Sequence, residues 1–160
     1  MTYCDADRVK GPRLFAFKGT YYYSIDQKGR ISIPAKFRDK TAFPDGEPYV
    51  VTKGLEPCLY IYPKETWLPI QEKLYQLQKF NLRTNRFLRN LLGNADDTHS
   101  DKLGRMTIPQ VLLDLACIKK DVVIIGVLDK IEVWDPVAYQ NFQAGHGDQN
   151  DDDMAKNLTI

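Results

Sequence analysis

Two nine-residue segments of this chain each pair an aspartate with an arginine four positions later. They occupy residues 26–34 and 101–109, and five positions are identical: the aspartate, a glycine, the arginine that follows it, and a later Ile-Pro pair. The guanidinium group of arginine is a planar fork of donors that can bind a carboxylate, a phosphate or a base edge with two parallel hydrogen bonds. A salt bridge that closes a β-turn is the simplest chemistry for one such segment. Two copies at a fixed separation of 75 positions indicate an internal repeat with a shared role.

The residues around the first segment predict a strand, a tight turn and a second strand. Residues 20–25 are β-favouring, and in residues 30–33 apolar and polar side chains alternate. Gly29 suits a turn position with positive φ, and the Asp26 carboxylate can accept hydrogen bonds from backbone N–H groups within the turn. Pro34 suits the first position of a helix. The prediction is therefore a β-hairpin followed by a short helix over residues 35–39.

The second segment predicts the same unit, with Asp101 and Gly104 in the turn and a more apolar helix over residues 109–115. Strands are predicted at residues 49–52 and 59–62, with counterparts at 122–127 and 131–134 in the second half. Tyr60 and Tyr62 could form a base-stacking platform, but packing within a sheet is the favoured interpretation. The repeat therefore extends well beyond the two turns.

Helices are predicted after the strands at residues 59–62 and 131–134, and one more is predicted between the two units. One begins near Thr66, since Pro69 is tolerable only in a first turn, and its apolar positions are Trp67, Ile70, Leu74 and Leu77. A second, over residues 82–92, should direct Phe87, Leu88, Leu91 and Leu92 toward a core. Its stripe of Arg83, Arg86 and Arg89 is interpreted as a solvated face, with subunit salt bridges or phosphate contacts left open. A short closing helix is predicted at residues 136–142.

At these residues the sequence resembles the MraZ family of bacterial transcriptional regulators. Besides the paired segments, the resemblance includes residues 54–63, 87–93 and 131–135 and extends from about Phe17 to about Phe142. It implies an α+β fold of two tandem AbrB-like swapped-hairpin β-barrel units, related by a pseudo-twofold axis, with short peripheral helices. It also implies a homo-oligomeric ring that binds short repeated G-rich boxes in promoters of division and cell-wall genes.

The resemblance also implies which residues contact double-stranded DNA. Lys28 and Arg30 in the first turn and Arg105 in the second, with Lys102 beside it, match the family's pattern by position. The chain departs from that pattern in its residues before Phe17, in an acidic run near its end, and in Leu103, which occupies the position of Lys28.

The chemistry of the major groove indicates which of these residues should contact base edges and which should contact phosphates. Arginine can donate two hydrogen bonds to guanine O6 and N7, a contact that discriminates by about 1 to 3 kcal/mol. We therefore expect Arg30 and Arg105 to read base edges, and the phosphates to be held by four further residues: Lys28, Lys102, Lys36 and Arg38. The alternative is a ring-forming interaction or scaffold protein whose turn arginines make salt bridges between subunits. An enzyme on a related barrel is a more distant alternative.

The net charge of +1 hides a strong segregation of charge along the chain. Counted in quarters of 40 residues, the charge of Lys and Arg against Asp and Glu is +5, −1, +3 and −6. Each positive quarter contains one of the turns. This distribution favours an anionic partner for the turns and a solubilising acidic segment over residues 148–153.

Other kinds of site find little support in the sequence. The sequence contains no glycine-rich phosphate-binding loop, no Ser-His-Asp order and no metal-ligand spacing. No catalytic residue, cofactor or metal is therefore expected. The three cysteines, Cys4, Cys58 and Cys117, are widely spaced and fit a reducing cytoplasm. The absence of a secretory signal pattern and of a long apolar run favours a cytoplasmic protein with no membrane partner. The DNA binding that the resemblance implies would make it nucleoid-associated.

These patterns together predict five parts of the chain. They are a flexible arm at residues 1–16, a first unit with its helix at 17–80, a linking helix and turn at 81–97, a second unit at 98–144, and an acidic tail at 145–160.

Overall fold

The computed structural model describes residues 16–38, 48–145 and 156–158. The predicted arm, apart from Ala16, and the acidic run at 148–153 lie outside this part of the chain. In the first half the elements are β1 (Phe17–Ser24), β2 (Arg30–Ser32), the 3-10 turn η1 (Ala35–Phe37), β3 (Tyr49–Lys53), β4 (Leu59–Pro63) and α1 (Lys64–Tyr75). They are followed by α2 (Leu82–Leu92), β5 (Asp96–Thr98), β6 (Arg105–Thr107), α3 (Gln110–Leu115), β7 (Asp121–Leu128), β8 (Lys130–Trp134) and α4 (Pro136–Gly145).

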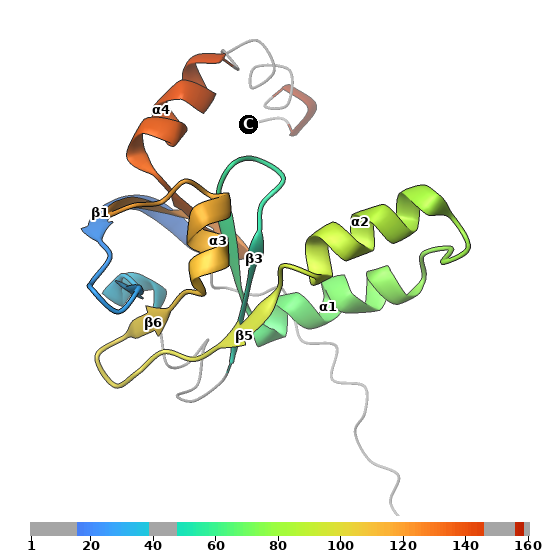
Figure 1. Ribbon diagram of the computed structural model, residues 1–160, viewed down its shortest axis with the longest axis horizontal. Coiled ribbons are helices and arrows are strands. Elements are labelled where there is room, and N and C mark those ends of the chain that lie inside the picture. Colours follow the sequence, from blue (N-terminus) through green and yellow to red (C-terminus); the bar gives the residue numbers. More distant parts are fainter. Residues whose placement is uncertain (1–15, 39–47, 146–155, 159–160) are drawn as a thin grey trace, which may run out of the picture.

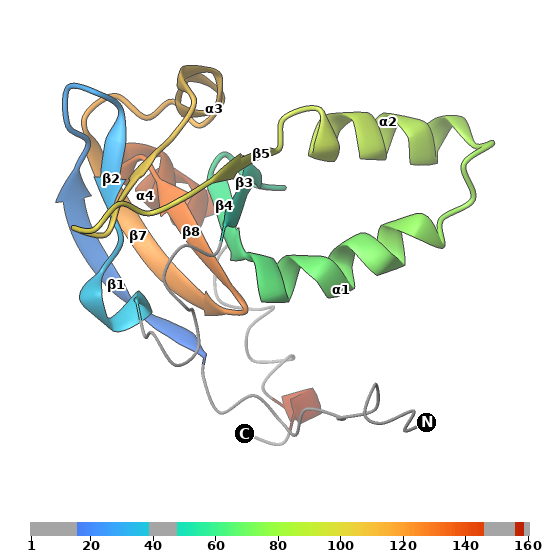
Figure 2. The ribbon, with the colours of Figure 1, turned by 90° about the horizontal axis from the view of Figure 1, so that it is seen from below.

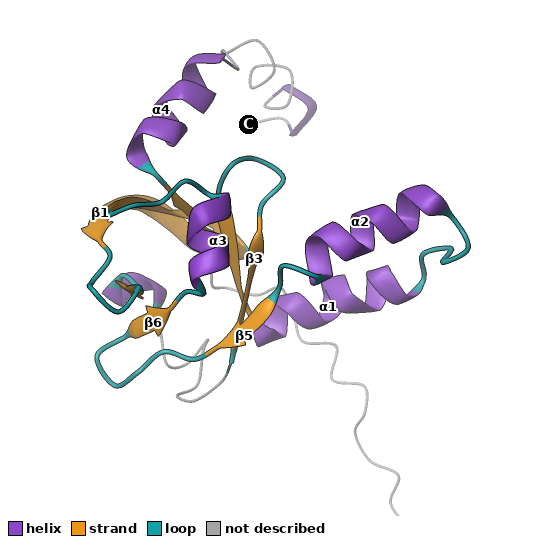
Figure 3. Ribbon diagram, in the orientation of Figure 1, coloured by secondary structure: helices purple, strands orange, loops and turns teal. Residues whose placement is uncertain are grey.

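The strands form one six-stranded antiparallel sheet and one two-stranded ladder. The order in the large sheet is β1-β7-β8-β4-β3-β5, and the ladder pairs β2 with β6. This order is symmetric: exchanging each strand of the first half for its counterpart in the second half gives the same list read backwards. The α+β class is therefore correct, and the helices lie around the sheet as predicted (Figure 3). The described strands do not close into a barrel.

The prediction of a local hairpin at the first turn is wrong. The strand before the turn, β1, pairs along its whole length with β7, from Phe17 opposite Leu128 to Ser24 opposite Asp121. The strand after the turn, β2, pairs with β6 of the other copy. The turn itself forms as expected, but an eight-residue ladder with a strand of the second half replaces the three-residue ladder that a hairpin would offer.

The β2-β6 ladder joins the two repeat copies through the protein core. Ile31 lies opposite Met106, and both side chains are completely buried. The ladder continues at each end through a backbone bond, since the Ile33 N–H donates to the Gly104 carbonyl at 2.8 Å and the Ile108 N–H donates to the Gly29 carbonyl at 3.0 Å. Because the pairing is antiparallel, the two turns lie at opposite ends of this ladder.

The core lies between the large sheet and the ladder. Its largest completely buried side chains come from both copies: Phe17, Ile31, Ile33, Phe37, Leu59, Ile61, Met106, Leu112, Ile124 and Ile131. The aromatic ring of Phe37 meets those of Phe17 and Tyr21 edge to face at 5.3 Å between centroids. Because these residues pack together in one cluster, the two halves share a single core.

Tyr60 and Tyr62 serve as packing residues in the sheet, as predicted. Tyr60 is buried, and Tyr62 is half-buried against Trp67, with 5.5 Å between the ring centroids. The predicted strands and the closing helix are also confirmed, with bounds that differ by only a few residues.

Helix α1 begins earlier than predicted. It starts at Lys64 directly after Pro63 and contains Pro69 in its interior, and it ends at Tyr75, so Leu77 lies beyond it. Proline removes one N–H donor from the helix without reversing the direction of the chain. The apolar contacts of Trp67 with the sheet hold the first turns in place.

Helix α2 also departs from the prediction, because it does not join the core. No residue of α2 is buried, and Phe87 and Leu92 are 43% and 44% exposed. Leu88 and Leu91 are only half-buried. The helix runs beside α1, and the pair projects away from the sheet (Figures 1 and 2). The sequence period correctly predicted an apolar face, but that face is covered only in part by α1.

Candidate nucleic-acid interface

The first turn is held by its own aspartate. The Oδ1 atom of Asp26 accepts hydrogen bonds from the backbone N–H groups of Lys28 at 2.9 Å and Arg30 at 3.0 Å. Its other oxygen, Oδ2, accepts from Nε of Arg30 at 2.6 Å. One carboxylate therefore shapes the backbone of the turn and orients the arginine side chain.

The second turn repeats this geometry atom for atom. Oδ1 of Asp101 accepts from the backbone N–H groups of Leu103 and Arg105, both at 2.9 Å, and Oδ2 accepts from Nε of Arg105 at 2.8 Å. Gly29 and Gly104 occupy the same left-handed conformation, with φ of 73° and 75°. Glycine adopts this conformation without the strain that a side chain would introduce.

The same contacts lower the pKa of both carboxyl groups. For Asp26 the hydrogen bond from the Arg30 backbone N–H has the largest effect, and the Arg30 side chain and the Lys28 N–H lower the pKa further. Asp101 has a lowered pKa for the corresponding reasons. Both aspartates are therefore ionised at neutral pH and pair with the arginines as charged groups.

The simple interpretation of the repeat, a salt bridge that closes a turn, is thus confirmed as far as the aspartates are concerned. This interpretation does not account for the whole side chain of each arginine, because the side chain of Arg30 is 25% exposed and that of Arg105 is 33% exposed. In the described part of the chain, each guanidinium hydrogen-bonds through Nε alone. The aspartate therefore acts as a clamp that fixes the guanidinium on one edge.

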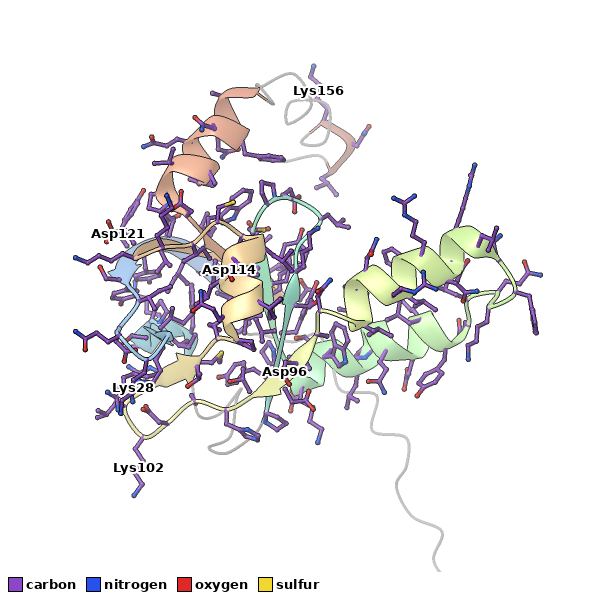
Figure 4. The ribbon with its side chains drawn as sticks, viewed as in Figure 1. Lys28, Asp96, Lys102, Asp114, Asp121 and Lys156 are labelled. Atoms are coloured by element: carbon purple, nitrogen blue, oxygen red, sulfur yellow. The ribbon has the colours of Figure 1, made fainter. Side chains whose placement is uncertain are left out.

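The two turns lie on the same side of the molecule, opposite the α1-α2 pair (Figures 1 and 2). Lys28 and Lys102 both extend outward on this side (Figure 4). They are exposed, as are Lys36 and Arg38 on η1. All six predicted DNA-contacting residues are therefore at least partly accessible, and they come from turns and a flanking segment that the β2-β6 ladder positions.

The segments flanking each turn come from the opposite copy. The η1 segment of the first copy lies against the second turn, where a Cβ on Gly104 would be 2.5 Å from Cδ and Nε of Arg38. Helix α3 of the second copy lies against the first turn, where a Cβ on Gly29 would be 3.8 Å from Cδ1 of Leu113. Sequence spacing gave no sign of this exchange, because it follows from the pairing of β2 with β6.

A second polar cluster, near the β3-β4 loop, has contacts that indicate a structural role. The Tyr60 hydroxyl donates to Glu56, and Lys130 Nζ lies 4.5 Å from the centroid of the Tyr60 ring. Burial raises the pKa of the neighbouring Cys58 thiol well above its usual range, with Glu132 as the next cause. A thiol in this environment is a poor nucleophile.

The described residues include no group of three or more His, Cys, Asp or Glu side chains that could hold a metal ion. His99, close to the second turn, is exposed. Within the same residues, no helix combines the length and the apolar character needed to cross a membrane.

Strand order and turn geometry define a tandem-repeat α+β protein with a pair of clamped arginines on one side. A family model described as "MraZ protein, putative antitoxin-like" matches the chain twice, at residues 16–90 and 91–159. A protein of Clostridium tetani named "Transcriptional regulator MraZ" is 42% identical over 126 residues, which cover 79% of this chain and 86% of that protein. A protein of the same name from Finegoldia magna is 38% identical over 142 residues, or 89% and 96% of the two chains. The chain belongs to the MraZ family.

Proposed function

We propose that this chain is a sequence-specific DNA-binding transcriptional regulator of division and cell-wall genes, acting in the cytoplasm on the nucleoid. Its relatives carry the name transcriptional regulator, and both positively charged quarters of the chain contain a turn. Double-stranded DNA is the anionic partner that fits such a surface.

The observation that carries the proposal is the shared clamp in the two turns. Asp26 and Asp101 hold the Nε edge of Arg30 and Arg105, which leaves the two terminal nitrogens to act together on a ligand. Guanine presents two acceptors, O6 and N7, to a bidentate donor of this kind in the major groove. A guanidinium fixed in advance also loses less conformational entropy on binding. This geometry supports the proposed preference for G-rich boxes.

Two turns cannot by themselves select a promoter, so we propose a ring of subunits that reads several short repeated boxes. The exchange of strand partners between the copies supports the swapped-hairpin arrangement implied for these units. The incompletely covered α1-α2 pair supports self-association. It contains an open cavity of about 310 Å³ lined mainly by Leu74, Tyr75, Leu88 and Leu92, and Tyr75 is 67% exposed.

The test is binding to promoter DNA with tandem G-rich boxes and to a shuffled duplex, measured by fluorescence anisotropy across a salt series. Arg30→Ala and Arg105→Ala should lower the ratio of specific to non-specific affinity. Lys28→Ala and Lys102→Ala should weaken both DNAs alike and reduce the salt slope by about one unit each. Equal losses on both duplexes from the arginine variants would contradict the assignment of base reading to Arg30 and Arg105.

The alternative, an interaction or scaffold protein with turn arginines in subunit contacts, makes the opposite prediction for assembly. Light scattering of the Arg30→Ala and Arg105→Ala variants separates the two functions. Intact assembly with lost DNA selectivity supports the regulator, whereas dissociated assembly supports the scaffold. The pairing of each arginine with an aspartate of its own turn favours the regulator.

A further inference from the structure

The two turns resemble each other, but the segments that flank them do not. Superposing the copies at their separation of 75 positions places Lys36 opposite Val111 and Arg38 opposite Leu113. The two positions that carry a cation in the first copy therefore carry an apolar residue in the second copy. The turns themselves are balanced, since each carries one lysine and one arginine.

Because the segment that flanks each turn comes from the other copy, these two cations lie beside the second turn. The Ile33 N–H donates to the Gly104 carbonyl at 2.8 Å, which places η1 beside the second turn. The side chain of Arg38 lies directly over Gly104, where there is no room for a Cβ atom. Lys36 is exposed on the same short turn. The cations of the first copy therefore lie beside the Asp101-Arg105 turn, at the opposite end of the β2-β6 ladder from the Asp26-Arg30 turn.

Lys120 lies near the first turn, since its carbonyl accepts a hydrogen bond from the Ile25 N–H at 2.7 Å, but neither of the two compared flank positions of this turn carries a cation. Its flank is α3, where Val111 is 58% exposed and Leu113 is buried against the core. Counting Asp26, Lys28 and Arg30 with positions 111 and 113 gives a charge of +1 for the first turn and its two compared flank positions. In the second turn Asp101, Lys102 and Arg105, counted with Lys36 and Arg38 on its flank, give a charge of +3, although Lys102 lies one position before the counterpart of Lys28.

Arg38 is also held in place for a role at the second turn. Its Nε donates to the carbonyl oxygen of Ile33 at 3.0 Å. Arginine has five N–H donors, so this bond fixes the side chain and uses only one of them. A fixed, exposed guanidinium beside Lys102 and Arg105 is suited to bind a phosphate next to the base that the turn reads.

We infer that the two DNA-binding ends are unequal, and that the second turn is the stronger one because Arg38 of the first copy supplies it with a phosphate contact. This inference rests on the proposed function. It adds that the binding surface of one repeat is completed by a residue of the other.

Two opposite substitutions test the inference. Arg38→Leu introduces the residue found at the related position, and Val111→Lys adds a cation to the flank of the first turn at an exposed site. On a tandem-box duplex, Arg38→Leu should reduce the salt slope of log K by about 0.9, and Val111→Lys should increase it by a similar amount. Between 50 and 200 mM salt each change corresponds to about a 3.5-fold difference in the loss of affinity. Arg105→Ala should also weaken binding more than Arg30→Ala.

Controls separate this inference from fold and function. Arg38→Lys keeps the charge and should keep the slope, whereas equal losses from Arg38→Lys and Arg38→Leu, accompanied by altered assembly, would show a purely structural role and overturn the inference. An unchanged slope in Arg38→Leu, or equal effects of Arg30→Ala and Arg105→Ala, would overturn it while DNA selectivity of the unsubstituted protein still stands. If that protein itself binds tandem boxes no better than shuffled DNA, the proposed function fails instead.

Discussion

Alanine substitution of the two turn glycines should destabilise the protein unequally, although both glycines have the same backbone conformation. Gly29 and Gly104 have φ of 73° and 75°. A side chain in this left-handed region costs about 1 to 2 kcal/mol, so both substitutions carry this common penalty. The difference in the free energy of unfolding between the two variants then depends on the atoms that surround each turn.

The surroundings differ at the position of the new methyl group. At Gly29 the nearest atoms are the Ile108 carbonyl oxygen at 3.5 Å and Leu113 Cδ1 at 3.8 Å, which are ordinary contacts. At Gly104 three atoms of Arg38 lie at 2.5 Å, so the arginine must move. Its bond to the Ile33 carbonyl would then be lost, which costs about 1 kcal/mol.

Thermal and urea unfolding, followed by circular dichroism at one protein concentration, measure the difference. For a chain of this size the additional 1 kcal/mol should lower the Tm of Gly104→Ala by about 2 to 4 °C below that of Gly29→Ala. Gly104→Ala should also lose the salt-dependent contact of Arg38 with DNA, which Gly29→Ala should keep. Equal Tm values, or a larger loss from Gly29→Ala, would refute the contact of η1 with the second turn.

Three further outcomes are expected. Because the folded-state pKa values of Asp26 and Asp101 are lowered from 3.8, their stabilisation is present above this pH and is lost as the pH falls through the folded values. The double variant with both changed to Asn should therefore show a flatter dependence of Tm on pH in acid. Cys58 should resist an aromatic disulfide reagent at pH 8 while exposed Cys117 reacts, as read from absorbance in a Cys4→Ser background. Thr52→Val removes a 2.8 Å hydrogen bond to a carbonyl of α2, and hydrogen exchange should become faster in that helix.

Local patterns were enough to predict the elements and the turns. Alternating apolar residues marked β2, and the position of glycine after the aspartate predicted the positive φ at Gly29. The pairing of strands could not be predicted in this way, because partner choice depends on distant residues. β1 forms an eight-residue ladder with β7, and nothing in the residues around the first turn indicates it.

The uncovered face of α2 was missed for a related reason. A helical period identifies which residues share a face, but not whether another element covers it. Phe87 and Leu92 satisfy the period and are nevertheless partly exposed. The residues of the candidate site could be proposed from the sequence, since all of them belong to the repeated segments or follow the first one directly, and their contact with DNA stays a prediction. Only the assignment of Arg38 to the second turn required the structure.

Because the segment that flanks each turn comes from the other copy, a substitution in one repeat can alter the surface of the other. In a hairpin, a substitution alters the surface of its own copy. Here Arg38 alters the surface of the second turn, and Leu113 packs beside the first. Each turn also depends on a ladder in which Ile31 and Met106 are buried only because both copies are present. Either repeat alone would expose this apolar surface and lose the segment that flanks its turn. The different flanks of the two turns, Arg38 at one and Leu113 at the other, are therefore a property of the pair, and neither repeat would retain its flank alone.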